Sequence, residues 1–151
     1  MTRWITYGND LRFLSTFNER VRALGDRLGP ILVRLPDGRP RDDGLLELLL
    51  GSVDPELRYA LDLRDPSWHV PEVAAALAAH GAVRVNDLEV AAPLRYLRLR
   101  DPPYEDADLR ELADRVRADL AAGTPVYAYF KHEDEPTAPR YARRLLELIE
   151  R

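Results

Sequence analysis

The stretch YLRLRD, residues 96–101, alternates apolar and basic residues with the period of a β-strand. Side chains of a strand point alternately to its two faces, so Leu97 and Leu99 share one face while Arg98 and Arg100 share the other. The same alternation recurs at ILVRLP (31–36), YALDLRD (59–65), AVRVND (82–87) and VYAYFK (126–131). Each of the five stretches therefore predicts a strand with one apolar and one polar face.

Segments with helical periodicity separate these stretches. Thr16 and Glu19 form a capping-box sequence at the start of an apolar stripe that extends to Leu24 and beyond. Further helices are expected to begin after Asp42 or Asp43, at Pro71, at Asp106 or Asp108 and after Thr137. With a short first strand in RWITY (3–7), the order becomes β-α-β-α-β-α-β-β-α-β-α, which is typical of an α/β fold with a mainly parallel sheet. Residues 88–95 are too few for a helical crossover, which leaves an extended loop or an antiparallel pair, and their sequence favours the loop.

The one-sided character of the strands indicates a barrel. Central strands of an open, two-sided α/β sheet are apolar on both faces, and these strands are not. A barrel gives every strand one face towards the helices and the other towards a shared interior. We therefore predict a single α/β domain over residues 1–151, a partial TIM-like (β/α) barrel of about six mainly parallel strands with outer helices.

Composition excludes several classes of protein. The formal net charge of −4 provides no global basic field that would attract nucleic acid. The absence of cysteine excludes a disulfide framework, a thiolate zinc site and a thiol nucleophile. The N-terminal segment has no signal-peptide core, and no apolar run approaches membrane-spanning length. A cytoplasmic protein without a membrane partner is the resulting expectation.

The polar strand faces carry an excess of positive charge. The residues on them are Arg34, Asp62, Arg64, Arg84, Asn86, Arg98, Arg100, Tyr127, Tyr129 and Lys131. In a barrel they would point towards a common axis, near the carboxyl ends of the strands where barrel enzymes build their sites. Two like charges about 6 Å apart repel by about 3 kcal/mol at an effective dielectric near 20. Such a cluster needs water, carboxylates or a bound anion.

This excess predicts a site for a phosphate-containing or other anionic ligand. The predicted ligand-binding residues are Arg34, Arg64, Trp68, Asn86, Arg98 and Arg100. If the protein is an enzyme, a hydrolase or an isomerase, Asp62 would orient the ligand or take a proton, assisted by Lys131 or His132. Neither a cofactor nor a metal is predicted.

Three alternatives stay open. The arginines and carboxylates could form a network that holds the strands together and binds nothing. They could also bind an anion or a nucleic-acid strand without catalysis, or the chain could be a degenerate, truncated relative of an active protein. Trp68 could stack on a ligand or anchor its loop.

The other polar motifs are expected at helix ends, in loops and on solvated faces. His80 is expected to complement the end of a helix, while His69 lies in a loop after a strand. The HEDE stretch (132–135) is interpreted as a solvated acidic loop. Arg140, Arg143 and Arg144 are expected to form a solvated basic stripe paired with Glu147 and Glu150.

Four motifs together resemble the YecE-like family of domains of unknown function. They are RVRALGDRLGPILVRLP (20–36), RYALDLRDPSW (58–68), YLRLRD (96–101) and VYAYFKHEDEPTAPRYARRLLEL (126–148). The resemblance implies a TIM-barrel fold in which RWITY forms the third strand. Arg64, Ser67, Trp68 and Arg98 match the family pattern.

The chain departs from that pattern at several positions. The family usually has Gln at Arg34, Glu at Asp62, His-Gly at Arg100-Asp101, and Asn at Lys131 and at Tyr141. Its first two strands have no counterpart here, which implies two open strand edges. Open edges pair readily with another chain. We therefore expect a homo-oligomer, or a separate N-terminal chain that covers the open side.

Overall fold

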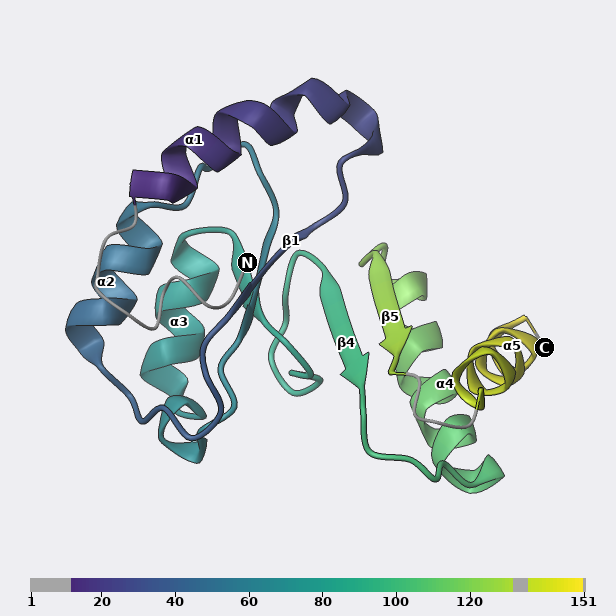
Figure 1. The fold of residues 1–151 in the computed structure, drawn as a ribbon. Helices are drawn as coiled ribbons and strands as arrows, with labels where there is room; N and C mark the ends of the chain where they lie inside the picture. Colours follow the sequence, from purple (N-terminus) through teal and green to yellow (C-terminus); the bar gives the residue numbers. More distant parts are fainter. Residues whose placement is uncertain (1–11, 132–135, 151) are drawn as a thin grey trace. The chain divides into compact units, whose positions relative to one another are not determined.

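The computed structural model describes residues 12–131 and 136–150 and shows a mixed α/β protein (Figure 1). The chain forms two compact units, residues 1–84 and 85–151. In chain order the elements are α1 (Arg12–Val21), the 3₁₀ helix η1 (Arg22–Arg27), β1 (Ile31–Arg34), α2 (Asp43–Gly51), β2 (Tyr59–Asp62), the 3₁₀ helix η2 (Pro66–Trp68), α3 (Pro71–Ala79), β3 (Ala82–Arg84), β4 (Arg95–Leu99), α4 (Asp106–Ala121), β5 (Val126–Phe130) and α5 (Ala138–Ile149). The α/β class is confirmed, while the partial barrel and the single domain stay predictions. RWITY lies outside the described residues.

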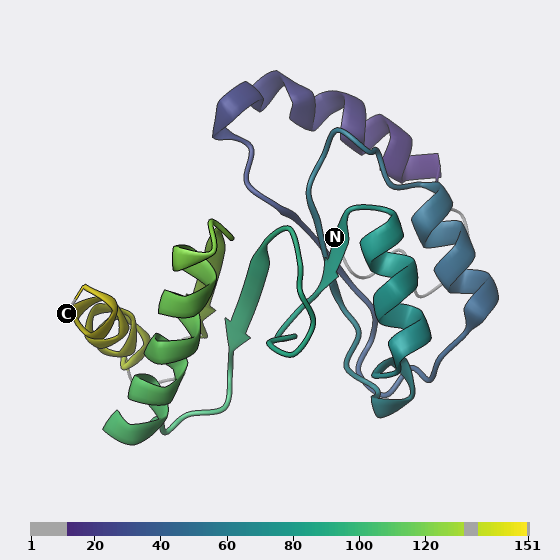
Figure 2. The same cartoon turned by 180° about the vertical axis from the view of Figure 1, so that it is seen from behind.

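The first unit contains a parallel sheet in the order β1-β2-β3. Figures 1 and 2 show α2 and α3 side by side against it. The core combines Ile31, Val33, Leu35, Tyr59, Leu61 and Leu63 with Leu45 and Leu49 of α2 and Val73 and Leu77 of α3. These strand residues belong to the predicted apolar faces. Burial of those faces against the helices is the main stabilising term for the unit.

The central strand of this sheet, β2, is buried on both faces. Ala60 and Asp62, which lie on its predicted polar face, are 0% and 2% exposed. Asp62 is paired in register with Arg34 of β1. A carboxylate buried to this degree needs charged or hydrogen-bonding partners.

The helix starts agree with the sequence in unit 1 except at α1. Asp42 is the N-cap of α2 and its Oδ1 accepts a hydrogen bond from the Leu45 N–H at 3.0 Å. The predicted cap at Thr16 is wrong, because α1 already includes Arg12. The apolar stripe also fails at Leu24, which is 47% exposed in η1. A 3₁₀ turn and a positive φ at Gly25 rotate this segment away from the register of α1.

The second unit pairs β4 with β5 in parallel, with Leu97 opposite Ala128 and Arg98 opposite Tyr129. Helices α4 and α5 pack on each other beside β5 (Figures 1 and 2). Their shared core contains Leu109, Ala113, Leu145 and Leu148. Within the described ranges, no helix is both long enough and apolar enough to cross a membrane.

The caps of this unit agree only in part with the sequence. Helix α4 begins at Asp106, one of the two predicted positions, and Asp108 accepts a hydrogen bond from the Glu105 N–H at 2.9 Å. Thr137 takes the N-cap position of α5, but its side chain makes no capping hydrogen bond. The connection 85–94 contains neither helix nor strand, so the expected loop is observed.

Candidate functional site

Four charged residues meet at the carboxyl ends of β1 and β2. Arg34 ends β1, Asp62 ends β2, Arg64 follows β2, and Asp37 lies in the turn after β1. We call them the Arg34–Arg64 cluster. The cluster combines the three residues that the sequence predicted on these strands with one aspartate that it did not predict.

The Asp37 carboxylate lies between the two guanidinium groups. Arg34 Nη2 donates to Asp37 Oδ1 at 2.8 Å and to Oδ2 at 2.9 Å. Arg64 Nη1 lies 2.6 Å from Asp37 Oδ1. The Arg34 hydrogen bond, together with the charge of Arg64, lowers the pKa of the Asp37 carboxyl. One carboxylate is thus held by a donor at the end of β1 and a donor just after the end of β2.

The buried carboxylate of Asp62 lies on the other side of the guanidinium groups. Its oxygens are 3.8 Å from Arg34 Nε and 3.6 Å from Arg64 Nε, close enough for ion pairing but too far for a hydrogen bond. Both Nε atoms are buried and lack a hydrogen-bond acceptor among the described residues. The two positive charges therefore face two negative charges, and the cluster as a whole is neutral.

Several hydrogen bonds hold the loop after β2 in place. Asp65 Oδ1 accepts hydrogen bonds from the Ser67 N–H at 3.0 Å and from its hydroxyl at 2.7 Å, which lowers the pKa of Asp65. The Arg41 N–H donates to Ser67 Oγ at 2.7 Å. Trp68 is 0% exposed, and its Nε1–H donates to the Arg39 carbonyl at 2.9 Å. These contacts favour the interpretation of Trp68 as a loop anchor.

The two described histidines bond to nearby backbone. His69 Nε2 lies 3.0 Å from the Leu63 carbonyl oxygen. His80 follows α3 in the C-cap position, with Nδ1 at 2.9 Å from the Ala76 carbonyl oxygen, as expected for a helix end. His132 and the HEDE stretch lie outside the described residues.

The second unit holds three more of the predicted cations, Arg98, Arg100 and Lys131, towards the carboxyl end of its strand pair, whereas Arg84 ends β3 of the first unit. The Lys131 N–H donates to the Leu99 carbonyl at 2.8 Å, which continues the parallel ladder and brings Lys131 beside Arg100. Arg98 is opposite Tyr129 in the same ladder. These residues lie on one face of the pair, where the rings of Tyr96 and Tyr129 are 5.2 Å apart.

Asn86 is hydrogen-bonded to β4 through both its backbone and its side chain. Its N–H donates to the Tyr96 carbonyl at 3.0 Å. Its Oδ1 accepts from the Arg98 N–H at 2.6 Å, and its Nδ2 donates to the Arg98 carbonyl at 3.1 Å. With φ at +59°, Asn86 adopts the left-handed conformation that asparagine tolerates better than most residues. The amide that we predicted to bind ligand therefore binds backbone in this structure.

Sequence reasoning also missed Arg95, a buried arginine of β4 with three hydrogen-bond acceptors. Its Nε donates to Asp119 Oδ2 at 2.8 Å, and its Nη1 donates to the carbonyls of Asp87 at 3.0 Å and Val90 at 2.5 Å. It lies on the same strand face as Leu97, where the alternation predicts an apolar side chain. The sequence does indicate Arg95, because it is a basic residue at a position where the alternation with Leu97 and Leu99 calls for an apolar one.

The comparisons relate this chain to one family. The whole of it, residues 1–151, matches the family model described as "Protein of unknown function DUF72". A search among curated proteins gives no match. One crystal structure of a DUF72 family protein from Enterococcus faecalis V583 has a TM-score of 0.79 and 15% identity, covering 100% of this chain and 74% of its own.

Two further crystal structures agree with that comparison. A second structure from Enterococcus faecalis V583 has a TM-score of 0.78 and 14% identity, and covers 100% of this chain and 70% of its own. A DUF72 family protein from Thermotoga maritima MSB8 has a TM-score of 0.74 and 18% identity, over 91% of this chain and 65% of its own. At these identities the likeness establishes the fold and no activity. Together with the family match, it shows that the chain belongs to the DUF72 family of proteins of unknown function, which is the YecE-like family.

Proposed function

We propose that the Arg34–Arg64 cluster binds a small anionic ligand, most naturally one that carries a phosphate group. The observation that supports this is the position of Asp37, whose carboxylate is held by Arg34 and Arg64 at 2.6 to 2.9 Å. Planar guanidinium forks recognise carboxylates and phosphates with the same geometry. An oxyanion of a ligand can therefore take the place of the Asp37 carboxylate.

Exposure supports this exchange. The Asp37 side chain is 57% exposed, whereas the side chains of Arg34 and Arg64 are 32% and 29% exposed. Exposed ion pairs contribute little to stability, so displacing Asp37 costs little. Asp37 also precedes Gly38, which has a φ of +69°, in a turn outside the strands. Arg34, by contrast, belongs to β1, Arg64 lies two residues after β2, and both guanidinium groups pair with the buried carboxylate of Asp62.

The proposal extends to a partial barrel. If the parallel strands of both units belong to one barrel, their carboxyl ends line a common mouth, where Arg98, Arg100 and Lys131 would add positive charge. The fold shared with longer DUF72 proteins supports this arrangement. In such a mouth Asp62 or Lys131 could exchange a proton with the ligand, which would suit a hydrolase or an isomerase.

The test is a calorimetric titration of the full chain with inorganic phosphate, a sugar phosphate and a nucleotide. We expect R34A and R64A each to weaken binding of the best ligand about tenfold, the effect of losing one charge-assisted hydrogen bond. R41A is the matched control, because Arg41 is similarly exposed but pairs with Asp43 outside the cluster. Circular dichroism should show equal folding of all variants.

Two results would overturn the proposal. One is the absence of binding by the wild type for every anion tested. The other is an equal affinity of the wild type and of the R34A/R64A double variant, because binding would then occur elsewhere.

A further inference from the structure

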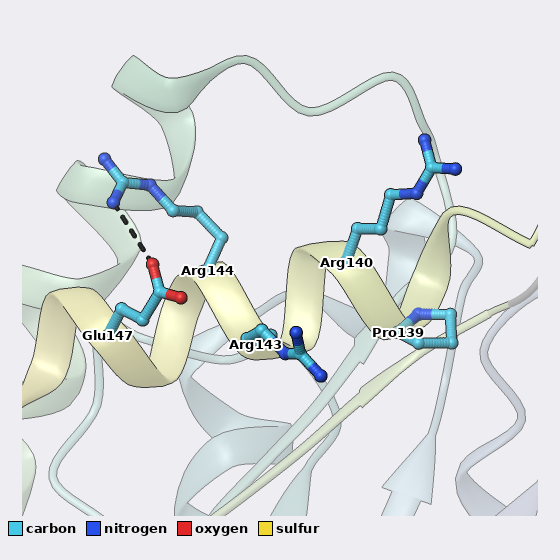
Figure 3. A pocket seen from close by; sticks show the side chains of 5 residues that line it. All are labelled: Pro139, Arg140, Arg143, Arg144 and Glu147. Atoms are coloured by element: carbon cyan, nitrogen blue, oxygen red, sulfur yellow. Dashed lines mark hydrogen bonds and ion pairs between the residues drawn. The ribbon is translucent and has the colours of Figure 1, made fainter.

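We propose a second phosphate-binding site on α5, independent of the Arg34–Arg64 cluster. A hollow of about 270 Å³ lies along this helix, lined by Pro139, Arg140, Arg143, Arg144 and Glu147 (Figure 3). We call this surface the α5 arginine face. Its described residues include three arginines and one carboxylate, in a protein whose net charge is −4.

Arg144 is already engaged by carboxylates. Its Nε donates to Asp106 Oδ1 at 2.5 Å, and its Nη2 donates to Asp106 Oδ2 at 3.0 Å. Its Nη1 lies 3.5 Å from Glu147 Oε2. These contacts connect α5 to the first turn of α4 and fix one end of the hollow.

Arg140 and Arg143 differ from Arg144. In the part of the chain that the structure describes, neither guanidinium has a hydrogen bond or an ion pair. The expected pairing of the whole basic stripe with Glu147 and Glu150 is thus observed only for Arg144 and Glu147. In Figure 3 the head group of Arg140 extends above α5 and that of Arg143 lies below it, so the two point to different sides of the helix in this conformation.

The spacing of these two arginines suits a single anion. Residues three apart on a helix lie about 5 to 6 Å apart at their Cβ atoms, so a change of side-chain rotamer brings both long side chains within reach of one group. Arg140 also lies in the first turn of this twelve-residue helix, where the helix dipole favours negative charge.

A phosphate group is the ligand with the best chemical match. It offers three acceptor oxygens to two guanidinium forks, each of which can bind in a bidentate manner. Among the described lining residues the carboxylate is Glu147, which lies at the far end beside Arg144. The phosphate can belong to a free monoester or to the backbone of a nucleic acid, and the two sources predict different results with separate probes.

The experiment uses the full chain with R34A and R64A in the background, which removes the first proposed site. Amide resonances of residues 138–144 are followed by ¹⁵N NMR during titration with inorganic phosphate and, separately, with a single-stranded oligonucleotide. We expect saturable shifts in this segment and about a tenfold loss of affinity in R140Q/R143Q. R22Q/R115Q removes the same charge from exposed arginines that have carboxylate partners and serves as the control.

Saturation by phosphate identifies a free phosphate ligand, and saturation by the oligonucleotide alone identifies a nucleic-acid backbone. Either result, if lost in R140Q/R143Q and kept in the control, supports the site. Unmoved resonances with both probes would overturn it, as would an equal loss in R22Q/R115Q. Because the first site is absent from this background, failure here does not affect the function proposed for it.

Discussion

Arg64 Nη1 lies 2.6 Å from Asp37 Oδ1, so a residue that follows β2 is paired with a residue in the turn after β1. This contact joins two neighbouring strand ends through side chains beyond the last backbone pair of the ladder. It also places the exposed carboxylate of Asp37 between the guanidinium groups of Arg34 and Arg64.

Removing that carboxylate should strengthen the binding of external anions. In D37N the two guanidinium groups keep Asp62 but lose their competing partner, so we expect the affinity for inorganic phosphate to rise about tenfold. Calorimetry of the wild type and D37N measures this difference. D43N is the control, because Asp43 is similarly exposed and pairs with Arg41. An unchanged or weaker affinity in D37N would show that Asp37 does not compete with the ligand.

Acid should weaken the link between α4 and α5. Hydrogen bonds from Arg144 and Arg110 lower the pKa of Asp106 far below its ordinary value of 3.8. A carboxyl with a lowered pKa in the folded state stabilises the protein above the pKa of the unfolded chain, and this contribution is lost as the pH falls through the folded pKa. We expect D106N to be less stable than the wild type near neutral pH.

The difference in free energy of unfolding between the wild type and D106N should become smaller as the pH is lowered from about 7 to about 2. Urea unfolding measures it at each pH. E111Q, on the exposed face of the same helix, is the control for a lost acidic charge. A difference in free energy of unfolding that stays constant over this pH range would contradict the role assigned to Asp106.

Arg95 is expected to be a major stabilising residue of the second unit. Its side chain is 8% exposed and pairs with Asp119, which is 17% exposed. R95M leaves that carboxylate and two backbone carbonyls without their donor, so the free energy of unfolding should fall by about 3 kcal/mol. Denaturant unfolding measures this loss. R115M is the control: it breaks an exposed ion pair and should change the free energy of unfolding little.

A double variant tests the cause of that loss. In R95M/D119L the orphaned carboxylate is absent, so part of the stability should return. If R95M and R95M/D119L are equally unstable, the lost backbone contacts of Arg95 dominate instead of its charge pair.

Strand positions were largely predictable from the sequence, because alternating burial leaves a local period-two pattern. The elements β1, β2, β3 and β5 lie inside the predicted stretches, and β4 begins one residue earlier, at Arg95. The start of α1 was less predictable. Thr16 and Glu19 are exposed positions in the middle of α1. Two polar residues three apart on the exposed face of a helix have the same spacing as a capping box, so the sequence does not distinguish the two.

The candidate site was predictable only in its strand residues. Alternation identified Arg34, Asp62 and Arg64, which the structure brings together. It could not identify Asp37, because that carboxylate returns to the cluster through a turn, and turn geometry has no period. Asn86 shows a related limit, since its polar character predicted a ligand while its left-handed backbone directs the amide onto Arg98.

Substitutions at Asn86 should separate its conformational role from its hydrogen bonds. N86A loses both bonds to the Arg98 backbone and leaves an alanine at a φ of +59°, whereas N86G loses the bonds without that strain. We expect the free energy of unfolding to fall by about 1 to 2 kcal/mol in N86G and by about 1 kcal/mol more in N86A. Denaturant unfolding gives the order, with E89A as a control on the exposed part of the same loop.

The same variants decide whether Asn86 also contacts a ligand. If its amide acts only on the backbone of Arg98, the phosphate affinity of N86G should stay near that of the wild type while its stability falls, because the two measurements then depend on different contacts. If N86G also loses phosphate affinity while circular dichroism shows an intact fold, the Asn86 amide contacts the ligand as well. An N86A variant more stable than N86G would contradict the left-handed geometry on which both expectations depend.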